Sequence, residues 1–519
     1  MTRLSSYLLD SWHEGSGSLR SLVDPSTEAE IAWTATEGLD LGAALQHARE
    51  VGGPALRALS FAQRGELIKA MSRALHTHRE ELIDLSMQNN GATRGDAKFD
   101  IDGATGTLSY YASLGRSLGE GRFQVEGEGD KLSSGARYVG QHVRLPRPGV
   151  AVHINAFNFP AWGTFEKVAV SILAGVPVLT KPATATALVA WRMAQIVAQD
   201  VALPPGAFSF LAGPVGDLLD HLGPQDMLAF TGSAATGAVL RASPAVLSRG
   251  TRLNVEADSL NAAVLGPDVG PGDDAWSTFI RNVVQDLSQK TGQKCTAIRR
   301  VMVPQERVAE VCEALQAELS RIVVGDPRQD GVRMGPVATA AQLRDVLAGV
   351  QRLSAQAKLL TGGTRVDGQG VPAGKGYFVA PTLLCASDAF AASDVHNHEV
   401  FGPSATVLPY DGSAAQAAAL VALGQGSLVS SVYADDRDWL GDFLLAAAPW
   451  NGRVQVVSGK VADQTTPPGM VLPSCVHGGP GRAGGGEELG GVRGMDFYTQ
   501  RVAIQGDRGL LGRIFGAGD

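Results

Sequence analysis

The spacing of apolar residues divides the chain into a helical front section and a longer section in which strands and helices alternate. Apolar residues recur at helical spacing from 56 to 87 and from 95 to 118, among Arg, Glu and His. Between 120 and 149 the pattern changes, because Gly-rich turns separate short segments of alternating polarity. This change predicts a β-hairpin that projects from the body.

Buried strands and helices alternate from residue 150 onward. The expected strands include VAVHIN (150–155), VPVLTK (176–181), FSFLAG (208–213) and a strand that ends at MLAFTG (227–232). The expected helices are 160–174, which Gly175 ends, 184–200, and one that opens near Ala234. Repeated strand–helix units of this kind predict a parallel sheet.

A second α/β section follows Glu256 and runs to about residue 450. It begins with a strand at NAAVLG (261–266) and a helix over 274–289. Beyond it, a Gly- and Pro-rich stretch precedes DFYTQRVAIQ (496–505), which alternates like a strand. We expect this last strand to pair with the hairpin near residue 130.

Composition indicates a globular protein with no general affinity for polyanions. The chain has 519 residues, of which 44% are hydrophobic and 18% charged, so two or three structural units are expected. A net charge of −8 and a pI near 5.7 argue against nucleic acid or an anionic membrane as a partner. No apolar run of about 18 residues occurs, so no membrane span is expected.

The four cysteines lie far apart and form no C-x-x-C pair. They are Cys295, Cys312, Cys385 and Cys475. Neither a disulfide framework nor a metal site is predicted, and a reducing cytoplasm fits this usage best.

The stretch TGQKCTA (291–297) surrounds Cys295 with polar neighbours, including Lys294. A nucleophilic cysteine needs a base to take its proton and donors for the oxyanion that its attack creates. Glu256, at the end of an expected strand, and Asn158, between a strand and a helix, are candidates for these roles. Taken singly, each has a structural alternative, since a buried Cys and an ion-paired Glu are common.

A glycine-containing turn, FTGSAATG (230–237), lies between a strand and a helix. Gly232, Ser233 and Gly237 are therefore candidates for binding a phosphate at the helix N-terminus, although such a turn is more often only a helix N-cap. Lys181 ends a strand and is either a ligand for a ribose or phosphate or a surface charge.

Together these stretches resemble the aldehyde dehydrogenase superfamily. Motifs occur in family order over nearly the whole chain: INAFNFP, VLTKPA, FTGSAATG, LNVEAD, GQKCTA, VGDP, GYFVAPTLL, HEVFGP and GGGEELGG. The resemblance implies an α/β fold with a Rossmann-like coenzyme-binding domain, an α/β catalytic domain and a small β flap that pairs subunits.

The resemblance also implies domain boundaries. Residues 1–124 and 148–257 correspond to the coenzyme-binding domain and 258–477 to the catalytic domain. Residues 125–147 and 478–519 correspond to the oligomerisation flap and the C-terminal tail. A homodimer or homotetramer is therefore expected.

By position, Cys295 resembles the family's nucleophile, Glu256 its general base and Asn158 its side-chain oxyanion donor. The implied reaction is thiolate attack on an aldehyde, hydride transfer to nicotinamide, and hydrolysis of the resulting thioester to a carboxylic acid. Lys167 and Glu488 match a polar relay behind the base, and a structural ion pair is an equal alternative. After Glu256 the chain reads Ala-Asp-Ser where relatives often read Leu-Gly-Gly.

Four positions bear on the coenzyme. Glu399 and Phe401 resemble the pair that binds the nicotinamide ribose and packs near the ring. Members that prefer NAD often carry a glutamate three residues after the lysine that corresponds to Lys181, and here that residue is Thr184. Without a carboxylate to repel a 2′-phosphate, NADP is predicted, with NAD as a weaker alternative.

The stretches VEADSLNAAVLGPD and LSSYLLDSW resemble dehydrogenases of ring-opened, CoA-linked semialdehydes in aerobic aromatic degradation. The expected substrate is therefore a small aldehyde, CoA-linked. Three alternatives stay open: a CoA-acylating dehydrogenase, which Glu256 argues against; a cysteine hydrolase or acyltransferase without redox chemistry; and a non-catalytic binding protein on this fold.

Overall fold

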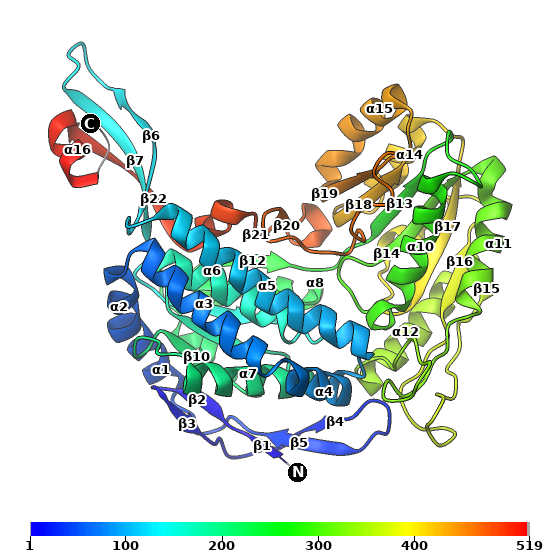
Figure 1. The fold of residues 1–519 in the computed structure, drawn as a ribbon, viewed down its shortest axis with the longest axis horizontal. Coiled ribbons are helices and arrows are strands. Elements are labelled where there is room, and N and C mark those ends of the chain that lie inside the picture. The colour runs from blue at the N-terminus through cyan, green and yellow to red at the C-terminus, as the bar shows by residue number, and fades with distance from the viewer. Residues whose placement is uncertain (1, 516–519) are drawn as a thin grey trace.

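Two seven-stranded sheets form the body of the protein, and a smaller three-stranded sheet projects from it (Figure 1). The computed structural model describes residues 2–515. The first sheet has the strand order β12-β11-β8-β9-β10-β2-β3. Its parallel strands are β8 (Ala151–Ile154), β9 (Val178–Lys181), β10 (Phe208–Phe210), β11 (Met227–Thr231) and β12 (Arg252–Glu256). The parallel sheet expected from residue 150 onward is confirmed.

Helices cover both faces of this sheet, and most residues of its parallel strands are accordingly buried. In β9, Val178 packs against one layer of helices and Leu179 against the other, because neighbouring strand residues point to opposite faces. The first layer contains α3 (Phe61–Thr77), α5 (Arg94–Leu118), α6 (Trp162–Ala174) and α7 (Ala187–Asp200). The second contains α1 (Leu41–His47) and α8 (Ala234–Arg241). The helical front section is thus confirmed, and Gly175 ends α6 with a φ of 87°.

Five short strands near the N-terminus were not predicted. They are β1 (Thr2–Leu4), β2 (Ser6–Leu8), β3 (Ser11–His13), β4 (Arg20–Val23) and β5 (Glu30–Thr34). Strands β2 and β3 extend the first sheet as an antiparallel edge. Segments of three to five residues are too short to show a recognisable alternation of polarity.

The second sheet has the order β15-β16-β17-β14-β13-β18-β19. Its strands are β13 (Asn261–Leu265), β14 (Ile298–Pro304), β15 (Lys358–Thr361), β16 (Thr382–Cys385), β17 (Ser404–Tyr410), β18 (Ser427–Tyr433) and β19 (Asn451–Val457). The main covering helices are α10 (Asp274–Ser288), α11 (Val308–Leu319), α12 (Ala340–Leu353), α14 (Ala414–Ala422) and α15 (Arg437–Ala447). The second α/β section is therefore confirmed, although β19 carries it slightly beyond its expected end.

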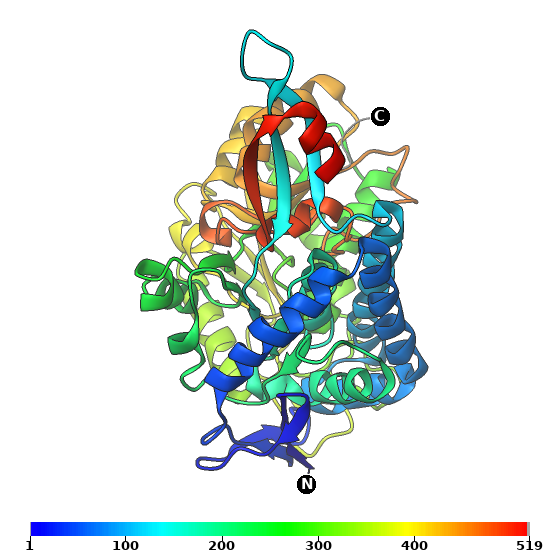
Figure 2. The same ribbon diagram turned by 90° about the vertical axis from the view of Figure 1, so that its left-hand side faces the viewer.

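The projecting sheet, which we call the flap, joins segments that are far apart in the sequence. It contains β6 (Gln124–Lys131), β7 (Tyr138–Pro146) and β22 (Thr499–Asp507), followed by α16 (Arg508–Phe515) (Figure 2). Strand β22 pairs antiparallel with β7, with Val502 opposite Val143. The expected pairing of the last strand with the hairpin is confirmed.

A short hairpin joins the two large domains. It consists of β20 (Val476–Gly478) and β21 (Glu487–Leu489), and it contacts β12 of the first sheet and β19 of the second. The predicted boundary between residues 477 and 478 runs through this hairpin, and the domain limits remain predictions. Among residues 2–515, no helix combines the length and apolarity needed to span a bilayer.

Candidate active site

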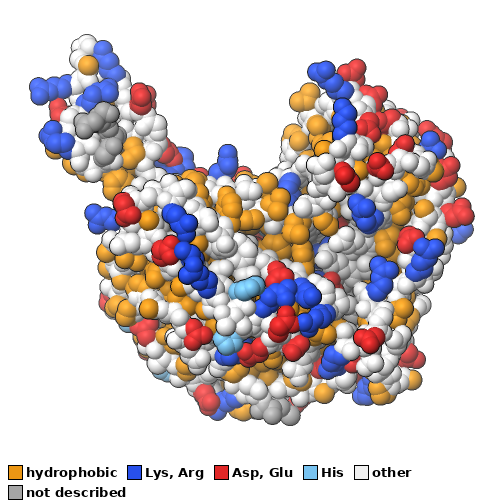
Figure 3. Space-filling model, viewed as in Figure 1, with side chains coloured by type: hydrophobic (Ala, Val, Ile, Leu, Met, Phe, Trp, Pro, Cys, Tyr) orange, Lys and Arg blue, Asp and Glu red, His pale blue; other side chains and the backbone are white. Residues whose placement is uncertain are grey.

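Two cavities meet at Cys295. A large cleft of about 820 Å³ is lined by Lys181, Glu399 and Phe401, among others. A small cavity of about 40 Å³ is lined by aromatic residues of α5 and α6 and by the residues 469 and 471. Cys295, Glu256 and Asn158 line both cavities, so the structure brings together the three residues that the sequence nominates for the chemistry. In space-filling view the molecule is hollowed between the projecting flap and the section that contains the second sheet, and hydrophobic side chains gather on the floor of this hollow (Figure 3).

A constrained turn carries Cys295 to this junction. Lys290, Thr291 and Gly292 have φ values of 51°, 56° and 66°, in the left-handed region that non-glycine residues avoid. At Gly292 a Cβ would lie 2.3 Å from the carbonyl oxygen of Gly402, so no larger residue fits there. The Thr291 hydroxyl donates to the Gly335 carbonyl at 2.9 Å and helps to hold the turn.

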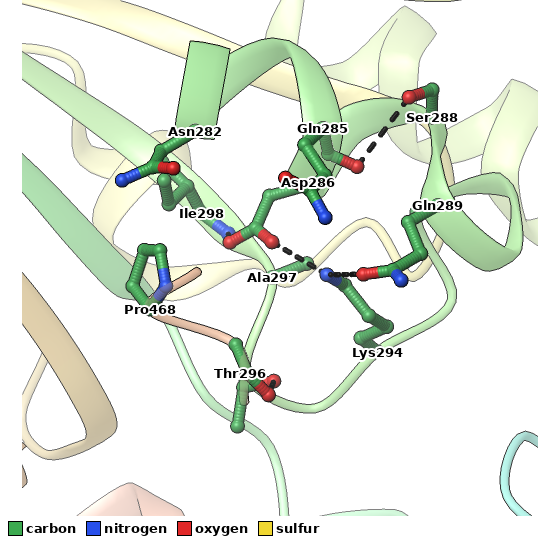
Figure 4. A network of polar contacts seen from close by, with 12 residues as sticks. Asn282, Gln285, Asp286, Ser288, Gln289, Lys294, Thr296, Ala297, Ile298 and Pro468 are labelled. Atoms are coloured by element: carbon green, nitrogen blue, oxygen red, sulfur yellow. Dashed lines mark hydrogen bonds and ion pairs between the residues drawn. The ribbon is translucent and has the colours of Figure 1, made fainter. Parts of the chain in front are cut away.

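Lys294 anchors the same turn and does not serve the thiol. Its ammonium group contacts the carboxylate of Asp286 and donates to the Gln289 side-chain oxygen at 2.9 Å (Figure 4). The other Asp286 oxygen accepts from the backbone N–H of Ile298 at 3.2 Å, and both charged side chains are fully buried. The positive charge of Lys294, next to Cys295 in sequence, is therefore neutralised by its ion pair with Asp286.

Glu256 and a histidine outside the predicted set, His477, flank the Cys295 sulfur. The imidazole Nε2 of His477 lies 3.3 Å from the Glu256 Oε1, and the Cys295 Sγ and one donor atom of each partner all lie within 4.8 Å of one another. Burial by itself raises the Glu256 pKa, but the neighbouring His477 and Lys167 outweigh it and hold that pKa at about 2. Glu256 is thus a carboxylate at neutral pH.

The resting thiol of Cys295 is protonated. Burial and the negative charge of Glu256 raise its pKa well above the ordinary value, because both disfavour a second anion at this site. A proton acceptor must therefore act when the sulfur attacks a carbon. Glu256, with a carboxylate oxygen within 4.8 Å of the sulfur, is the anionic acceptor placed to take that proton.

Asn158 lies on the segment between β8 and α6. Its amide Nδ2 donates to the Gln293 carbonyl at 3.0 Å, two residues before the cysteine. This bond fixes the amide beside the Cys295 turn and uses one of its two N–H groups. The second N–H suits an oxyanion on a carbon bonded to the sulfur.

Lys167 and Glu488 form a buried ion pair behind Glu256. The Lys167 Nζ lies 3.1 Å from Glu488 Oε2 and 3.4 Å from Glu166 Oε1. Glu488 also accepts from the Asn254 amide at 3.1 Å. Neither Lys167 nor Glu488 touches Glu256 directly, so the structure brings the pair near the site without deciding between a relay and an ion pair that is structural.

On the large-cleft side, Glu399 and Phe401 are held by Arg299. The Arg299 side chain lies 3.8 Å from Glu399 and 5.5 Å from the centre of the Phe401 ring, and it donates to the Gly292 carbonyl at 2.8 Å. Burial raises the pKa of Glu399 to about 8. Its Oε1 makes no hydrogen bond within the described chain, so this acid can serve a polar group in the cleft.

Some of the remaining residues predicted to bind the coenzyme line the large cleft, and others do not. Lys181, Gly232 and Ser233 line the cleft, whereas Thr184 and Gly237 are not among its lining residues in the described structure. Burial lowers the pKa of Lys181 to about 8. The N–H of Gly232 is already bonded to the Glu256 carbonyl at 3.1 Å, and Gly237 instead permits close packing of α8 against β12.

Ser233 is the N-cap of α8, as the alternative interpretation expected, and accepts from Thr236 N–H at 3.2 Å. Asp258 also occupies this helix end, where it accepts from Ala234 N–H at 2.9 Å. The Ala-Asp-Ser departure after Glu256 therefore supplies an acidic residue to the cleft. A phosphate at the α8 N-terminus would share that end with a carboxylate.

Three residues of the site were missed by the sequence analysis: Glu166, Asp258 and His477. His477 lies in a Gly-rich stretch that predicts only turns, and its partner Glu256 is 221 positions earlier in the chain. Glu166 lies in α6 next to Lys167, and no motif in the sequence marks it as part of the site. Only the fold brings these groups to the junction.

The chain matches the aldehyde dehydrogenase family over residues 12–504. It belongs to that family. A 3,4-dehydroadipyl-CoA semialdehyde dehydrogenase of Aromatoleum evansii is 43% identical over 92% of this chain and 93% of its own length. A geranial dehydrogenase of Castellaniella defragrans is 28% identical over 87% and 88%. The crystal structure of an NAD-dependent aldehyde dehydrogenase from Sinorhizobium meliloti superposes with a TM-score of 0.84 at 22% identity, covering 98% of this chain and 95% of that one.

Family membership establishes the class of reaction and the fold. This aldehyde dehydrogenase is an oxidoreductase that oxidises aldehydes with NAD(P), and its two α/β domains have the architecture expected from the sequence. The alternatives of a cysteine hydrolase without redox chemistry and of a non-catalytic binding protein are thereby set aside.

The buried pair of Lys294 and Asp286 generates a stability prediction. Lys294→Met should lower the free energy of unfolding by about 3–5 kcal/mol, because it leaves the Asp286 carboxylate buried and unpaired. The apparent melting temperature should fall accordingly in differential scanning fluorimetry.

Two further variants complete this test. The double variant Lys294→Met with Asp286→Leu should recover part of the loss, and the exposed Lys460→Met should melt like the wild type. A single variant as stable as the wild type would show that the pair does not anchor the turn.

Proposed function

We propose that this aldehyde dehydrogenase oxidises a CoA-linked semialdehyde, 3,4-dehydroadipyl-CoA semialdehyde, to the free acid, with NADP as the preferred coenzyme. The relative from Aromatoleum evansii that bears this substrate's name is similar over nearly the full length of both chains, which supports the assignment. The observation that carries the chemistry is the position of Cys295 at the junction of the two cavities.

In the proposed reaction, Cys295 Sγ adds to the aldehyde carbon and its proton passes to Glu256. The oxygen of the new thiohemiacetal lies between the Asn158 amide and the Cys295 backbone N–H, which has no hydrogen-bond partner within residues 2–515. Bound NAD(P) supplies the hydride acceptor on the large-cleft side. After Glu256 has released the thiol proton to solvent, it takes a proton from the water that hydrolyses the thioester on Cys295, and the C–S bond breaks to release the carboxylic acid.

The cleft residues fit a nicotinamide dinucleotide. Glu399 Oε1 is buried without a hydrogen bond in the described chain, and a ribose hydroxyl would satisfy it. Phe401 offers an apolar face beside Cys295. Lys181 offers a buried amine whose only hydrogen bond within residues 2–515 is to the neighbouring Pro182 carbonyl at 3.1 Å. Gly232 and Ser233 line the same cleft and would lie near the phosphates.

The flap supports the proposal of a homodimer or homotetramer. It stands out from the body (Figure 1), and some of its apolar residues are exposed. Val502, Leu510 and Ile514 are 37%, 48% and 56% exposed. A contact with a second copy would remove this apolar surface from water.

The coenzyme preference is testable at Thr184. The wild type should turn over faster with NADP than with NAD at equal concentration, because Thr184 carries no charge to repel a 2′-phosphate near Lys181. Thr184→Glu should lower kcat/KM for NADP about tenfold and spare NAD, and Thr184→Gln is the uncharged control. The assay follows reduced nicotinamide by absorbance across free and CoA-linked aldehydes. A wild type that prefers NAD would refute the assignment.

Release of a free acid, rather than transfer to CoA, depends on Glu256. Glu256→Gln should lower steady-state turnover at least about a hundredfold, because both the thiol and the attacking water lose their base, and any acyl group that forms on Cys295 should persist. Intact-protein and peptide mass spectrometry would detect the adduct, and Glu128→Gln in the flap is the control. Acid release by Glu256→Gln at the wild-type rate, or product formation only when CoA is added, would contradict hydrolysis.

A further inference from the structure

His477 belongs to no function considered so far, yet it is 6% exposed and lines the small cavity together with Cys295. It lies on β20, where the β20–β21 pairing sets it opposite Glu488. Residues opposite each other in an antiparallel pair share a face of the sheet. The pairing of β20 with β21 therefore places His477 against Glu256 and Glu488 against Lys167.

Without a charge on His477, the buried ionisable groups around it would carry a net negative charge. It faces Glu256 of β12, Glu166 of α6 and Glu488 of β21, and the only other cation in this cluster is Lys167 of α6. Three carboxylates and one ammonium group leave a buried excess of negative charge, which is costly away from water. The cluster therefore binds protons beyond the one on Lys167, and both Glu166 and His477 are placed to carry them.

We propose that His477 is a positioning residue which, as an imidazolium, pairs with Glu256 and stabilises the Cys295 thiolate and the thiolate that leaves during hydrolysis. The inference rests on the proposed roles of Cys295 and Glu256. Lys294, the cation next to the cysteine in sequence, is engaged with Asp286 and cannot take this role.

The proton movements are as follows. The S–H bond of Cys295 breaks and its proton passes to Glu256, so that thiolate and imidazolium face each other within 4.8 Å. The sulfur electron pair then forms the C–S bond as the carbonyl π pair moves to oxygen. Glu256 releases the thiol proton to solvent before hydrolysis begins. The water oxygen then bonds to the thioester carbon, Glu256 takes the water proton, and the C–S electron pair returns to sulfur beside the imidazolium.

The nearby carboxylates raise the pKa of His477 above its ordinary value, although burial alone would lower it. The imidazolium is thus present below that raised pKa and disappears as the pH rises through it. Its effect on the thiolate should be largest near neutral pH and should fade at alkaline pH.

The test is the rate of Cys295 alkylation by iodoacetamide between pH 5.5 and 9.5, followed by peptide mass spectrometry. It needs neither aldehyde nor nucleotide, so its result is independent of the proposed dehydrogenase reaction. His477→Gln should alkylate about tenfold more slowly at pH 7, as expected for a thiol pKa raised by one unit, and should converge with the wild type at high pH. The exposed His76→Gln should match the wild type throughout.

Turnover of His477→Gln is measured in parallel, and His477→Phe, which keeps a ring without the charge, replaces it if the first variant does not fold. If the alkylation profile of His477→Gln superposes on that of the wild type, the proposal is overturned. Slow turnover of the variant would not rescue it, because a change in the shape of the small cavity would be enough to slow turnover. If the shifted profile appears but the wild type oxidises no aldehyde, the proposed function fails and the inference about His477 stands.

Discussion

The chemistry of the site depends on the close approach of the Cys295 thiol, at the edge of a cleft, to the buried carboxylate of Glu256. Burial and the charge of Glu256 both raise the pKa of the Cys295 thiol, so the protonated form dominates at rest. The same carboxylate is the group that can accept the thiol proton, and an amide and a free backbone N–H lie where the new oxyanion forms. A protonated resting thiol also protects the enzyme from indiscriminate alkylation and oxidation, since the thiolate is the reactive form.

The scaffold places these groups from distant parts of the chain. Glu256 ends β12 of the first sheet, Cys295 precedes β14 of the second, and the β20–β21 hairpin closes the gap between the domains. The left-handed turn at residues 290–292 and the buried pair of Lys294 and Asp286 fix the cysteine rigidly. Such a rigid turn suits a nucleophile that must meet a carbon within a few tenths of an ångström.

Part of this arrangement can be predicted from the sequence, because it depends on residues that are contiguous in the chain. The strands around Val178 and Ala263 have apolar runs between turn residues, and the motifs around Cys295 and Glu256 are contiguous. The short N-terminal strands lack enough residues for a pattern, and His477 becomes meaningful only through pairing across the chain. At the α8 N-terminus, the glycine turn suggested free N–H donors, but the Glu256 carbonyl and Asp258 already accept from them.

The account depends on a covalent bond between Cys295 and the substrate carbon. The most direct measurement is aldehyde oxidation by Cys295→Ala, with the exposed Cys475→Ala as the control for loss of a thiol. The account predicts that Cys295→Ala forms neither reduced nicotinamide nor acid above background, while Cys475→Ala turns over like the wild type. Undiminished oxidation by Cys295→Ala would contradict it.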